Sequence, residues 1–505
     1  MQIPKEIKFV LEQLKKAGFE AYIVGGCVRD LLREVEPQDW DVATNAKPEK
    51  IGKIFLRSFA ANLFGTVTVL TGSKNPKLKE IEITPYRIDE KYTDKRHPDK
   101  IRWAKNIEED LTRRDFTINA LALDLLDMRC PKVIDPFNGQ KDLKAKIIRA
   151  VGEAEDRFNE DALRMIRAVR FATTLNFEVD EAKASSPPFA RLRLAWVIEE
   201  KTAQAIKKNS FWLQAISKER IRDEFLKIIM AEKAVEGVEL LRKLGLLKYI
   251  LPELEEGYKV TQNKHHIYDC YEHSLLSLKY AAQKNFNRDV RLAALFHDIA
   301  KPRTKRGEGQ DCTFYGHEIV GAKMTAQILN RLRCPKKDIE KIVKLVRYHL
   351  FYYNVDEVSE SSVRRLVRQA GPENMEELLQ VRMADRIGSG VPKAEPYKLR
   401  HLKYIIEKVS RDPISVKMLK VSGHDAIKIL GIKPGPKVGQ ILDVLLGYVL
   451  SDPKKNKEEF LEKEIEKLGK LSEKELSSLA QKAKKDREEL EMKRDEMTKK
   501  KYWVT

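Results

Sequence analysis

Apolar and polar positions change their spacing near residue 151, and this change divides the chain into two regions. Before it, short apolar or alternating runs rich in β-branched residues indicate strands, whereas apolar residues every three to four positions indicate helices. The predicted elements are strands at 21–24, 65–71 and 80–84 and helices at 4–18 and 48–59. We therefore predict that residues 1–150 form an α+β unit, a mixed sheet with helices.

After residue 151 the pattern is almost entirely helical, and short Gly or Pro breaks separate the periodic segments. We therefore predict all-α units as far as the C-terminus. Residues 185–196 interrupt this region as a loop that contains two prolines and an aromatic, basic stretch. Lys and Glu dominate residues 453–505, which predicts an exposed helix with a frayed end.

Composition narrows the classes of protein. Hydrophobic residues make up 42% of the 505 residues and charged residues 34%, which excludes a wholly disordered chain and a polytopic membrane protein. No apolar run reaches the roughly 20 residues that cross a bilayer, and no signal peptide is visible. The five cysteines lack CxxC spacing, so we expect a cytoplasmic protein. The net charge of +19 favours a polyanionic partner.

A glycine pair marks the first group of candidate functional residues. Gly25 and Gly26 end the first predicted strand and open a helix, where backbone N–H groups can approach an anion closely. Arg29 follows one turn later and adds a guanidinium. The segment therefore predicts contact with a phosphate or a ribose.

Two aspartates follow this turn. Asp39 and Asp41 are two positions apart, so in an extended segment their carboxylates project to one side. Like charges this close are unfavourable unless a divalent cation neutralises them, and oxygen ligands suit Mg²⁺ bound to substrate phosphates. Glu82, on the predicted strand 80–84, offers a third carboxylate. These acids predict metal-dependent nucleotidyl transfer.

Five motifs in order resemble those of the bacterial class II tRNA nucleotidyltransferases. This is the CCA-adding enzyme family, which also includes bacterial poly(A) polymerase. The resemblance is strong over about residues 15–255 and continues more loosely through Ser217–Arg222 into the C-terminal half. The motifs are Gly25–Leu32, Asp39–Asp41, Asp110–Ala120, Asp135–Gly139 and Glu160–Phe171. The resemblance implies Mg²⁺-dependent addition of nucleotides from CTP and ATP to tRNA, with release of pyrophosphate.

The resemblance also implies roles for individual residues. The catalytic, metal-binding acids correspond to Asp39 and Asp41, with Glu82 as a third acid. The residues that bind or select the nucleotide correspond to Gly25, Gly26, Arg29, Arg114, Asp161, Arg164, Arg167 and Arg170.

Asp161 and Arg164 have the right chemistry to select a base. At positions i and i+3 of one helix, their tips can meet one planar edge. Cytosine and adenine both present an amino donor beside a ring-nitrogen acceptor, which matches a carboxylate that accepts and a guanidinium that donates. Uracil and guanine present the reversed order and would leave polar groups unpaired, which makes their rejection strong.

The residues before the Arg-Arg-Asp motif bear on which nucleotides are added. Residues 87–99 resemble the flexible loop of full CCA-adding members, which CC-only members shorten or lack. Full CCA addition is the leading interpretation, and addition of A alone or poly(A) synthesis are the alternatives. An HD phosphohydrolase with an inactive transferase head, or a noncatalytic tRNA-binding protein, fits the acidic residues less well.

Histidines and aspartates on successive predicted helices form a second group. Residues 265–273 are predicted as a helix, and a later His-Asp doublet lies on an apolar helix that Pro302 is expected to end. Their order resembles the HD phosphohydrolase superfamily, including the extra histidines of its binuclear members. The resemblance implies a site for a divalent transition metal or Mg²⁺, and hydrolysis of phosphoesters such as 2′,3′-cyclic phosphates at a damaged tRNA end. The implied ligands are His273, His297, Asp298, His317, His349 and Asp385.

The remaining helical part contains a Gly-Pro turn between amphipathic helices at 425–442, where Lys433 and Lys437 could hold phosphate. The family grips tRNA with this C-terminal region, although a purely structural hairpin is nearly as plausible. No protein partner can be inferred from the sequence, and no membrane association is expected. The predicted divisions are a catalytic head at 1–150, a neck at 151–255, an HD domain at 256–390, a tRNA-binding body at 391–470 and a charged helix or tail at 471–505.

Overall fold

The computed structural model of the chain describes residues 3–60, 65–90, 100–125, 131–175, 197–263, 267–410 and 416–504. The predicted loop at 185–196 lies outside them. The chain forms two compact units, one of Met1–Leu350 with Glu377–Pro392 and one of Phe351–Glu376 with Lys393–Thr505. No helix of the described residues is long and apolar enough to cross a membrane.

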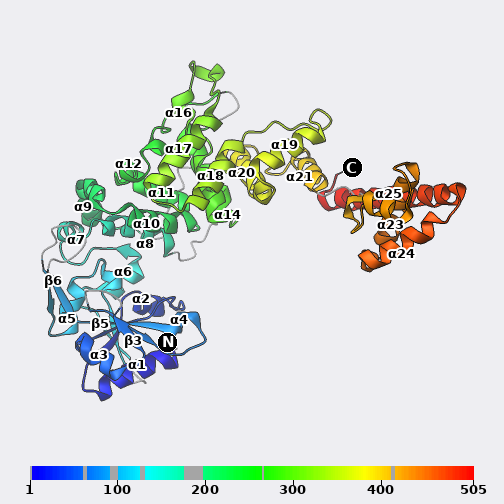
Figure 1. The fold of residues 1–505 in the computed structure, drawn as a ribbon. Coiled ribbons are helices and arrows are strands. Elements are labelled where there is room, and N and C mark those ends of the chain that lie inside the picture. The colour runs from blue at the N-terminus through cyan, green and yellow to red at the C-terminus, as the bar shows by residue number, and fades with distance from the viewer. Residues whose placement is uncertain are drawn as a thin grey trace. The chain divides into compact units, whose positions relative to one another are not determined.

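A seven-stranded mixed sheet organises the head, as the sequence predicted (Figure 1). The central strand β2 runs parallel to β5 and antiparallel to β1. All three strands predicted from the sequence, at 21–24, 65–71 and 80–84, are present in it. In order across the sheet, the strands are β3 (Ser58–Ala60), β4 (Val67–Leu70), β5 (Glu80–Pro85), β2 (Asp41–Thr44), β1 (Ala21–Val24), β8 (Ala122–Asp124) and β9 (Lys132–Ile134).

Amphipathic helices bury one face of the sheet. Helix α1 (Lys5–Lys16) confirms the helix predicted at 4–18 and buries four residues at helical spacing. The helix predicted at 48–59 is too long, because α3 (Pro48–Ile54) ends early and residues 58–60 pair with β4 as a strand. The remaining helices of the head are α2 (Gly26–Leu32), α4 (Pro76–Lys79), α5 (Ile107–Thr112) and α6 (Gly139–Ala145).

The segment interpreted as a loop at 87–99 begins as a strand. Strand β6 (Arg87–Glu90) pairs antiparallel with β7 (Lys100–Trp103). Residues 91–99 lie outside the described residues, so the resemblance of this segment to the loop of full CCA-adding members stays a prediction.

Helices follow the head, as predicted. One short exception is the pair of two-residue strands β10 (Ile147–Ile148) and β11 (Val197–Ile198), which run parallel. The helices up to residue 255 are α7 (Ala154–Glu160), α8 (Leu163–Thr174), α9 (Glu200–Asn209), α10 (Lys218–Met230), α11 (Ala234–Lys243), α12 (Leu247–Ile250) and α13 (Pro252–Glu255).

Two helix boundaries in the His-Asp region differ from the prediction. Helix α14 begins at Cys270, because Asp269 and Glu272 form a capping box, so residues 267–269 are not helical. Pro302 does not end the helix of the His-Asp doublet; α15 ends at Phe296, and the proline lies in the first turn of the next helix, where no N–H is needed. The helices of this region are α14 (Cys270–Gln283), α15 (Arg288–Phe296), α16 (Lys301–Thr304), α17 (His317–Arg331), α18 (Lys336–Tyr348) and α20 (Met375–Gly388).

The second unit is helical and has its own apolar core. The Gly-Pro turn joins two helices as predicted, with Gly431 in the left-handed region (φ 61°) ending the first. The exposed helix predicted at 453–505 is wrong in part, because it is two helices whose Leu461, Ile465 and Leu476 lie in the core. The helices of this unit are α19 (Glu360–Ala370), α21 (Tyr397–Ser410), α22 (Gly423–Leu430), α23 (Pro436–Ser451), α24 (Glu458–Gly469) and α25 (Glu473–Tyr502).

Candidate functional sites

Two acids of the head lie side by side on adjacent parallel strands. Asp41 is the first residue of β2 and is the register partner of Glu82 on β5. Asp39 lies two residues before β2. Among the described residues, these three carboxylates do not form a set whose ligand atoms all lie within 4.8 Å of one another. The sheet therefore brings Asp41 and Glu82 together, and Asp39 joins them from the segment that leads into the strand.

The environment of Asp41 favours a bound cation. Burial raises the pKa of this carboxyl to about 6; the Arg114 guanidinium opposes the rise, whereas Glu82 and Asp39 add to it. A buried carboxylate beside two others is stabilised by a positive charge. Arg114 supplies part of that charge, and its side chain also donates to Asp110 over 3.3 Å.

The turn before α2 requires glycine. Gly25 has φ 79°, in the left-handed region, and a Cβ there would lie 2.8 Å from Nη1 of Arg114 and 3.7 Å from Oδ2 of Asp41. The guanidinium that the resemblance assigns to the nucleotide therefore lies against this turn and close to Asp41, the predicted catalytic acid.

Arg29 is buried within the head. Its Nη1 donates to Asn119 over 2.7 Å, and its Nε donates to Asp30 over 2.9 Å. The same guanidinium lies 5.3 Å from the centre of the Phe171 ring on α8. Arg29 thus links the glycine turn to the segment after the Arg-Arg-Asp motif and to the neck.

Asp161 and Arg164 are close in sequence, but they do not share a helix. Helix α8 begins at Leu163, whereas Asp161 has extended backbone angles and accepts the Leu163 N–H over 3.1 Å. The prediction that both lie on one helix is therefore wrong, because Asp161 uses its carboxylate to cap the first turn.

Each of these two groups has another ionic partner. Both oxygens of Asp161 accept from Arg220 on α10, over 2.7 and 3.3 Å. Arg164 donates to Glu160 over 2.6 Å and to the Arg113 carbonyl over 2.8 Å. A guanidinium carries five N–H donors, and among the described residues the Nε–H of Arg164 has no partner. The pair keeps hydrogen-bonding capacity for a ligand.

Arg167 and Arg170 are engaged in ion pairs within the protein. Arg167 donates through Nε to Asp115 over 2.8 Å, and this carboxylate has a lowered pKa of about 2. Arg170 pairs with Glu224 on α10 and lies 3.8 Å from the centre of the Phe171 ring. Arg170 therefore joins α8 to α10, whereas Arg167 joins α8 to the head.

One segment of the head connects the acids with α8. Arg114 lies beside Asp41, the carbonyl of its neighbour Arg113 accepts from Arg164, and Asp115 pairs with Arg167. The acids predicted to be catalytic and the residues predicted to select the base are thus joined through three consecutive residues.

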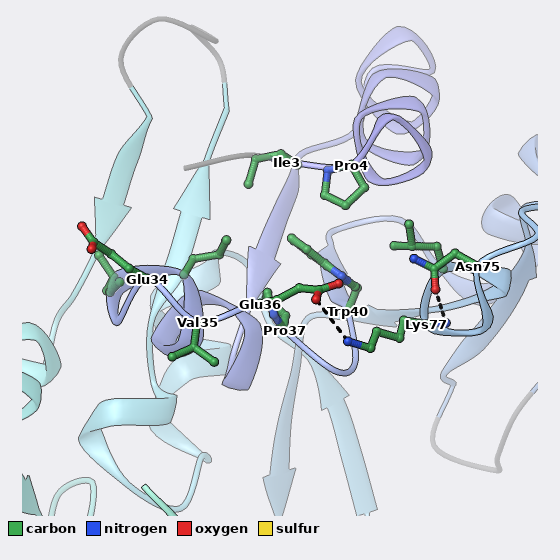
Figure 2. Close-up of a pocket in the computed structure, with 12 residues that line it drawn as sticks. Ile3, Pro4, Glu34, Val35, Glu36, Pro37, Trp40, Asn75 and Lys77 are labelled. Atoms are coloured by element: carbon green, nitrogen blue, oxygen red, sulfur yellow. Dashed lines mark hydrogen bonds and ion pairs between the residues drawn. The ribbon is translucent and has the colours of Figure 1, made fainter. Parts of the chain in front are cut away.

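One cavity of the head is not lined by these acids. It has a volume of about 800 Å³ and is lined mainly by apolar residues, including Trp40. Figure 2 shows Trp40 in this cavity beside the ion pair of Glu36 and Lys77, which are 3.3 Å apart. Because side chains alternate along an extended segment, Trp40 packs into the core while its neighbours Asp39 and Asp41 take the other side.

The His-Asp region contains two overlapping sets of buried residues that could bind a metal ion. Within each set, the ligand atoms all lie within 4.8 Å of one another. They bring together all six ligands that the sequence predicted. One set is His273, His297, Asp298 and Asp385, and the other is Asp298, His317 and His349.

Asp298 belongs to both sets and uses a different oxygen for each. Oδ2 lies 3.1 Å from Nε2 of His273 and 3.2 Å from Nε2 of His297. Oδ1 lies 3.2 Å from Nε2 of His317 and 3.6 Å from Nε2 of His349. Asp298 therefore faces both ligand sets and would be shared by the cations that the two sets could hold.

The histidine rings are oriented to present Nε2 to a cation. In His297, His317 and His349, Nδ1 lies 2.7–2.8 Å from the carbonyl of the residue three positions earlier. A carbonyl only accepts, so Nδ1 carries the proton and Nε2 presents its lone pair. The donor set therefore fits a divalent transition metal.

Lys301, which sequence reasoning did not single out, also contacts this site. Its Nζ lies 2.7 Å from Oδ2 of Asp298 and donates to Gln262 over 2.6 Å. Burial opposes the charge on Asp298, but Lys301 and His297 hold the pKa of this carboxyl well below its usual range.

Three family models match the chain. They are the poly A polymerase head domain over residues 21–149, the probable RNA and SrmB-binding site of polymerase A over 197–257, and the HD domain over 270–389. Together with the acids of the head, the first match defines a nucleotidyltransferase of the poly(A) polymerase head class.

Curated relatives narrow this class. A CCA-adding enzyme of Ligilactobacillus salivarius is 33% identical over 477 residues, 92% of this chain and 99% of that protein. An A-adding tRNA nucleotidyltransferase of Deinococcus radiodurans is 32% identical over 84% of this chain and 90% of that protein. A CCA-adding enzyme of Lactobacillus delbrueckii is 47% identical over 238 residues, so the chain spans only about half (53%) of its length. The chain belongs to the CCA-adding enzyme family of tRNA nucleotidyltransferases.

A solved structure agrees with this family. The CCA-adding enzyme of Bacillus stearothermophilus in complex with CTP has a TM-score of 0.57 and 27% identity, over 92% of this chain and 98% of that chain.

Proposed function

We propose that this protein adds the 3′-terminal CCA to tRNA, taking nucleotides from CTP and ATP and releasing pyrophosphate. The single observation that carries the proposal is the continuous connection from Asp41 through Arg114 and Arg113 to Arg164. It joins an acidic cation site to groups that match the polar edges of cytosine and adenine. The fold match to an enzyme solved with CTP supports the same substrate class.

The residues of the head would act on the triphosphate. Asp39, Asp41 and Glu82 would hold Mg²⁺, which when bound lowers the pKa of the attacking hydroxyl and neutralises phosphate charge. Arg114 would bind phosphate oxygens beside Asp41, and the Gly25–Gly26 turn admits the backbone to the same phosphates. The tRNA 3′ oxygen bonds to the α-phosphorus, the bond to the bridging oxygen breaks, and pyrophosphate leaves.

Base selection is proposed for Asp161 and Arg164. Asp161 would accept from the amino group of cytosine or adenine, and Arg164 would donate to the adjacent ring nitrogen. Arg220 and Glu160 hold these two groups in place, so the template is set before the nucleotide enters. A fixed template stabilises binding because less freedom is lost on association.

Full CCA addition is favoured over addition of A alone. The similarity to the Ligilactobacillus enzyme covers more of both chains than the similarity to the A-adding Deinococcus enzyme, although the identities are nearly equal. The test uses three tRNA transcripts, one without CCA, one without only the terminal A and one complete, each with single labelled nucleotides. We expect C, C and A to be added to the first transcript and A to the second. Addition of A to the second transcript with no addition to the first would instead indicate an A-adding enzyme, and long A tails would indicate a poly(A) polymerase.

A second activity is proposed for the His-Asp site, which is hydrolysis of a phosphoester at a damaged tRNA end. The observation that favours it is the bridging position of Asp298 between two buried ligand sets. If these residues hold two cations, the cations would supply charge that stabilises the attacking and leaving oxygens of a phosphoester. We propose a divalent transition metal or Mg²⁺ as the ion.

A 2′,3′-cyclic nucleotide tests this second activity. Wild type with added metal should hydrolyse it, whereas Asp298→Ala should not. Because Asp298 is buried, His317→Ala serves as a milder variant that leaves the first ligand set intact. Equal rates for wild type and both variants would remove the hydrolase proposal and leave the transferase proposal untouched.

We also propose a cytoplasmic location. Cys27, Cys270, Cys312 and Cys334 carry free thiols in the described part of the chain, and free thiols persist in a reducing compartment.

A further inference from the structure

Helix α19 carries a row of exposed arginines on one face. Val363, Val367 and Ala370 are buried. On the opposite face, Arg364, Arg365 and Arg368 are exposed. With 1.5 Å of rise per residue, the three guanidiniums start from backbone positions within about 6 Å along the helix axis. We call these three residues the arginine row.

None of the three guanidiniums is neutralised by a carboxylate in the described part of the chain. The only acid within the helix, Glu360, is already paired with Lys408 over 2.8 Å. In the preceding turn, Glu357 accepts from Tyr352 and Asn354, and Asp356 is exposed. Other cations of this unit do lie in ion pairs, such as Lys403 with Glu395 and Lys501 with Glu407. The arginine row is therefore available to an anion.

The neighbouring helix adds an aromatic side chain at one end of the row. Helix α21 packs against α19, and the Glu360–Lys408 ion pair joins the start of α19 to the end of α21. The two helices therefore run antiparallel, which places the start of α21 at the Arg368 end. There Tyr397 is 38% exposed, and the Arg400 guanidinium lies 5.8 Å from the centre of its ring.

We infer that the arginine row binds the sugar-phosphate backbone of a structured RNA, with Tyr397 as an adjacent stacking surface. Guanidiniums bind phosphate through two parallel hydrogen bonds, and aromatic rings stack on exposed bases. The inference rests on the proposed tRNA substrate and assigns a contact to a helix that lies within the sequence of the HD match but belongs to the second unit.

The chemistry of the face favours RNA over an anionic membrane. No large hydrophobic residue of α19 is exposed, so the helix has nothing to insert among lipid tails. The density of guanidiniums instead suits regularly spaced phosphates. Binding of this kind depends strongly on salt, because each neutralised phosphate releases counterions.

The test compares two triple variants of the full chain. In one, Arg364, Arg365 and Arg368 become alanine. In the matched control, three exposed lysines of α17 and α18, which lie outside the predicted tRNA-binding body and have no ion pair in the described chain, become alanine, so the net charge falls equally; they are Lys323, Lys337 and Lys344. Both are compared with wild type for tRNA binding by fluorescence anisotropy at several KCl concentrations, and circular dichroism checks their folding. If the arginine triple variant does not fold, Arg364→Ala and Arg368→Ala replace it.

We expect the arginine variant to bind tRNA about tenfold or more weakly and to lose roughly 2–3 from the slope of log affinity against log salt. The control should stay within about twofold of wild type. Wild-type binding by the arginine variant, or equal weakening of both variants, would overturn the inference. So would binding to phosphatidylglycerol vesicles that depends on the row while tRNA binding does not.

The outcome for the proposed function is read separately. If wild type incorporates no nucleotide into any transcript yet binds tRNA through the arginine row, the proposed transferase activity is wrong and the RNA-binding inference is unaffected. If wild type incorporates nucleotides normally but the arginine variant binds tRNA like wild type, the RNA-binding inference is wrong and the proposed transferase activity is unaffected.

Discussion

The carboxylate of Asp161 is held by Arg220, with both of its oxygens accepting from one guanidinium over 2.7 and 3.3 Å. Arg220 lies at the start of α10, 59 positions further along the chain. A two-point ion pair fixes the plane of a carboxylate as well as its position. The orientation of the proposed base-selecting acid therefore depends on the packing of α10 against α8.

Loss of Arg220 should impair base selection before it impairs folding. Arg220→Ala frees the Asp161 carboxylate, and misplacement of a reacting geometry by about 1 Å costs on the order of 10²-fold in rate. We expect kcat/KM for CTP and ATP to fall by about that factor and misincorporation of UTP and GTP to rise. Arg222→Ala removes an arginine from the same helix that pairs with Asp223 instead, and it should discriminate normally. Unchanged discrimination in Arg220→Ala would show that this ion pair has no part in selection.

The Arg170–Glu224 pair should contribute strongly to stability. Both side chains are mostly buried, at 15% and 6% exposure, and the guanidinium also stacks on Phe171. Removal of one partner leaves a buried charge, which costs about 3–5 kcal/mol. Arg170→Ala should therefore unfold at markedly lower urea than wild type, whereas the double variant with Glu224→Gln should recover part of the loss. A double variant that is as unstable as Arg170→Ala would contradict this reading.

The pH dependence of stability should report the Asp115–Arg167 pair. Burial alone would raise the pKa of Asp115, but Arg167, Asn119 and Arg164 lower it to about 2, against roughly 3.9 when unfolded. A depressed folded pKa stabilises the protein above the unfolded value, by about 3 kcal/mol here, and this gain is lost as the pH falls from about 4 toward 2.

Asp115→Asn removes that titration. The difference in unfolding free energy between wild type and Asp115→Asn should be constant from pH 7 to 5 and shrink between pH 4 and 3. Urea unfolding followed by circular dichroism measures it. A difference that stays the same down to pH 3 would mean that Asp115 is not held ionised by its partners.

Metal content should separate the two ligand sets of the His-Asp site. Because His317 belongs to only one set, His317→Ala should lower the metal content from two ions per chain to one, and His273→Ala should do the same through the other set. His401 pairs with Tyr353 in the second unit, so His401→Ala is the control and should keep both ions. Mass spectrometry of metal-loaded, dialysed protein gives the count, and a His317→Ala variant that keeps two ions would exclude the second set.

Much of the fold was predictable from local spacing. In the strands at 21–24 and 80–84 and the helix at 4–18, the spacing of apolar residues matches the positions that are buried. The strand at 58–60 was missed because its pairing with β4 overrides the helical spacing of the preceding residues. Tertiary pairing of this kind has no signature in a short window.

The sequence predicted which residues belong to the candidate sites, but it did not predict the side chains that those residues contact. The six His and Asp ligands converge as their order indicated. The contacts of Asp161 and Arg167 with Arg220 and Asp115 were not foreseen, because they join segments more than fifty positions apart. The Arg220 contact had one available signal, since this residue lies within the weaker motif Ser217–Arg222.

The most direct measurement of the central claim is incorporation of each of the four nucleotides into a tRNA transcript without CCA, by wild type, Asp161→Ala and Asp41→Asn. If the acids and the base-selecting pair form one site, wild type adds only C, C and A, Asp161→Ala adds nucleotides slowly and accepts UTP and GTP, and Asp41→Asn adds none while still binding tRNA. Full discrimination by Asp161→Ala, or normal addition by Asp41→Asn, would contradict the account.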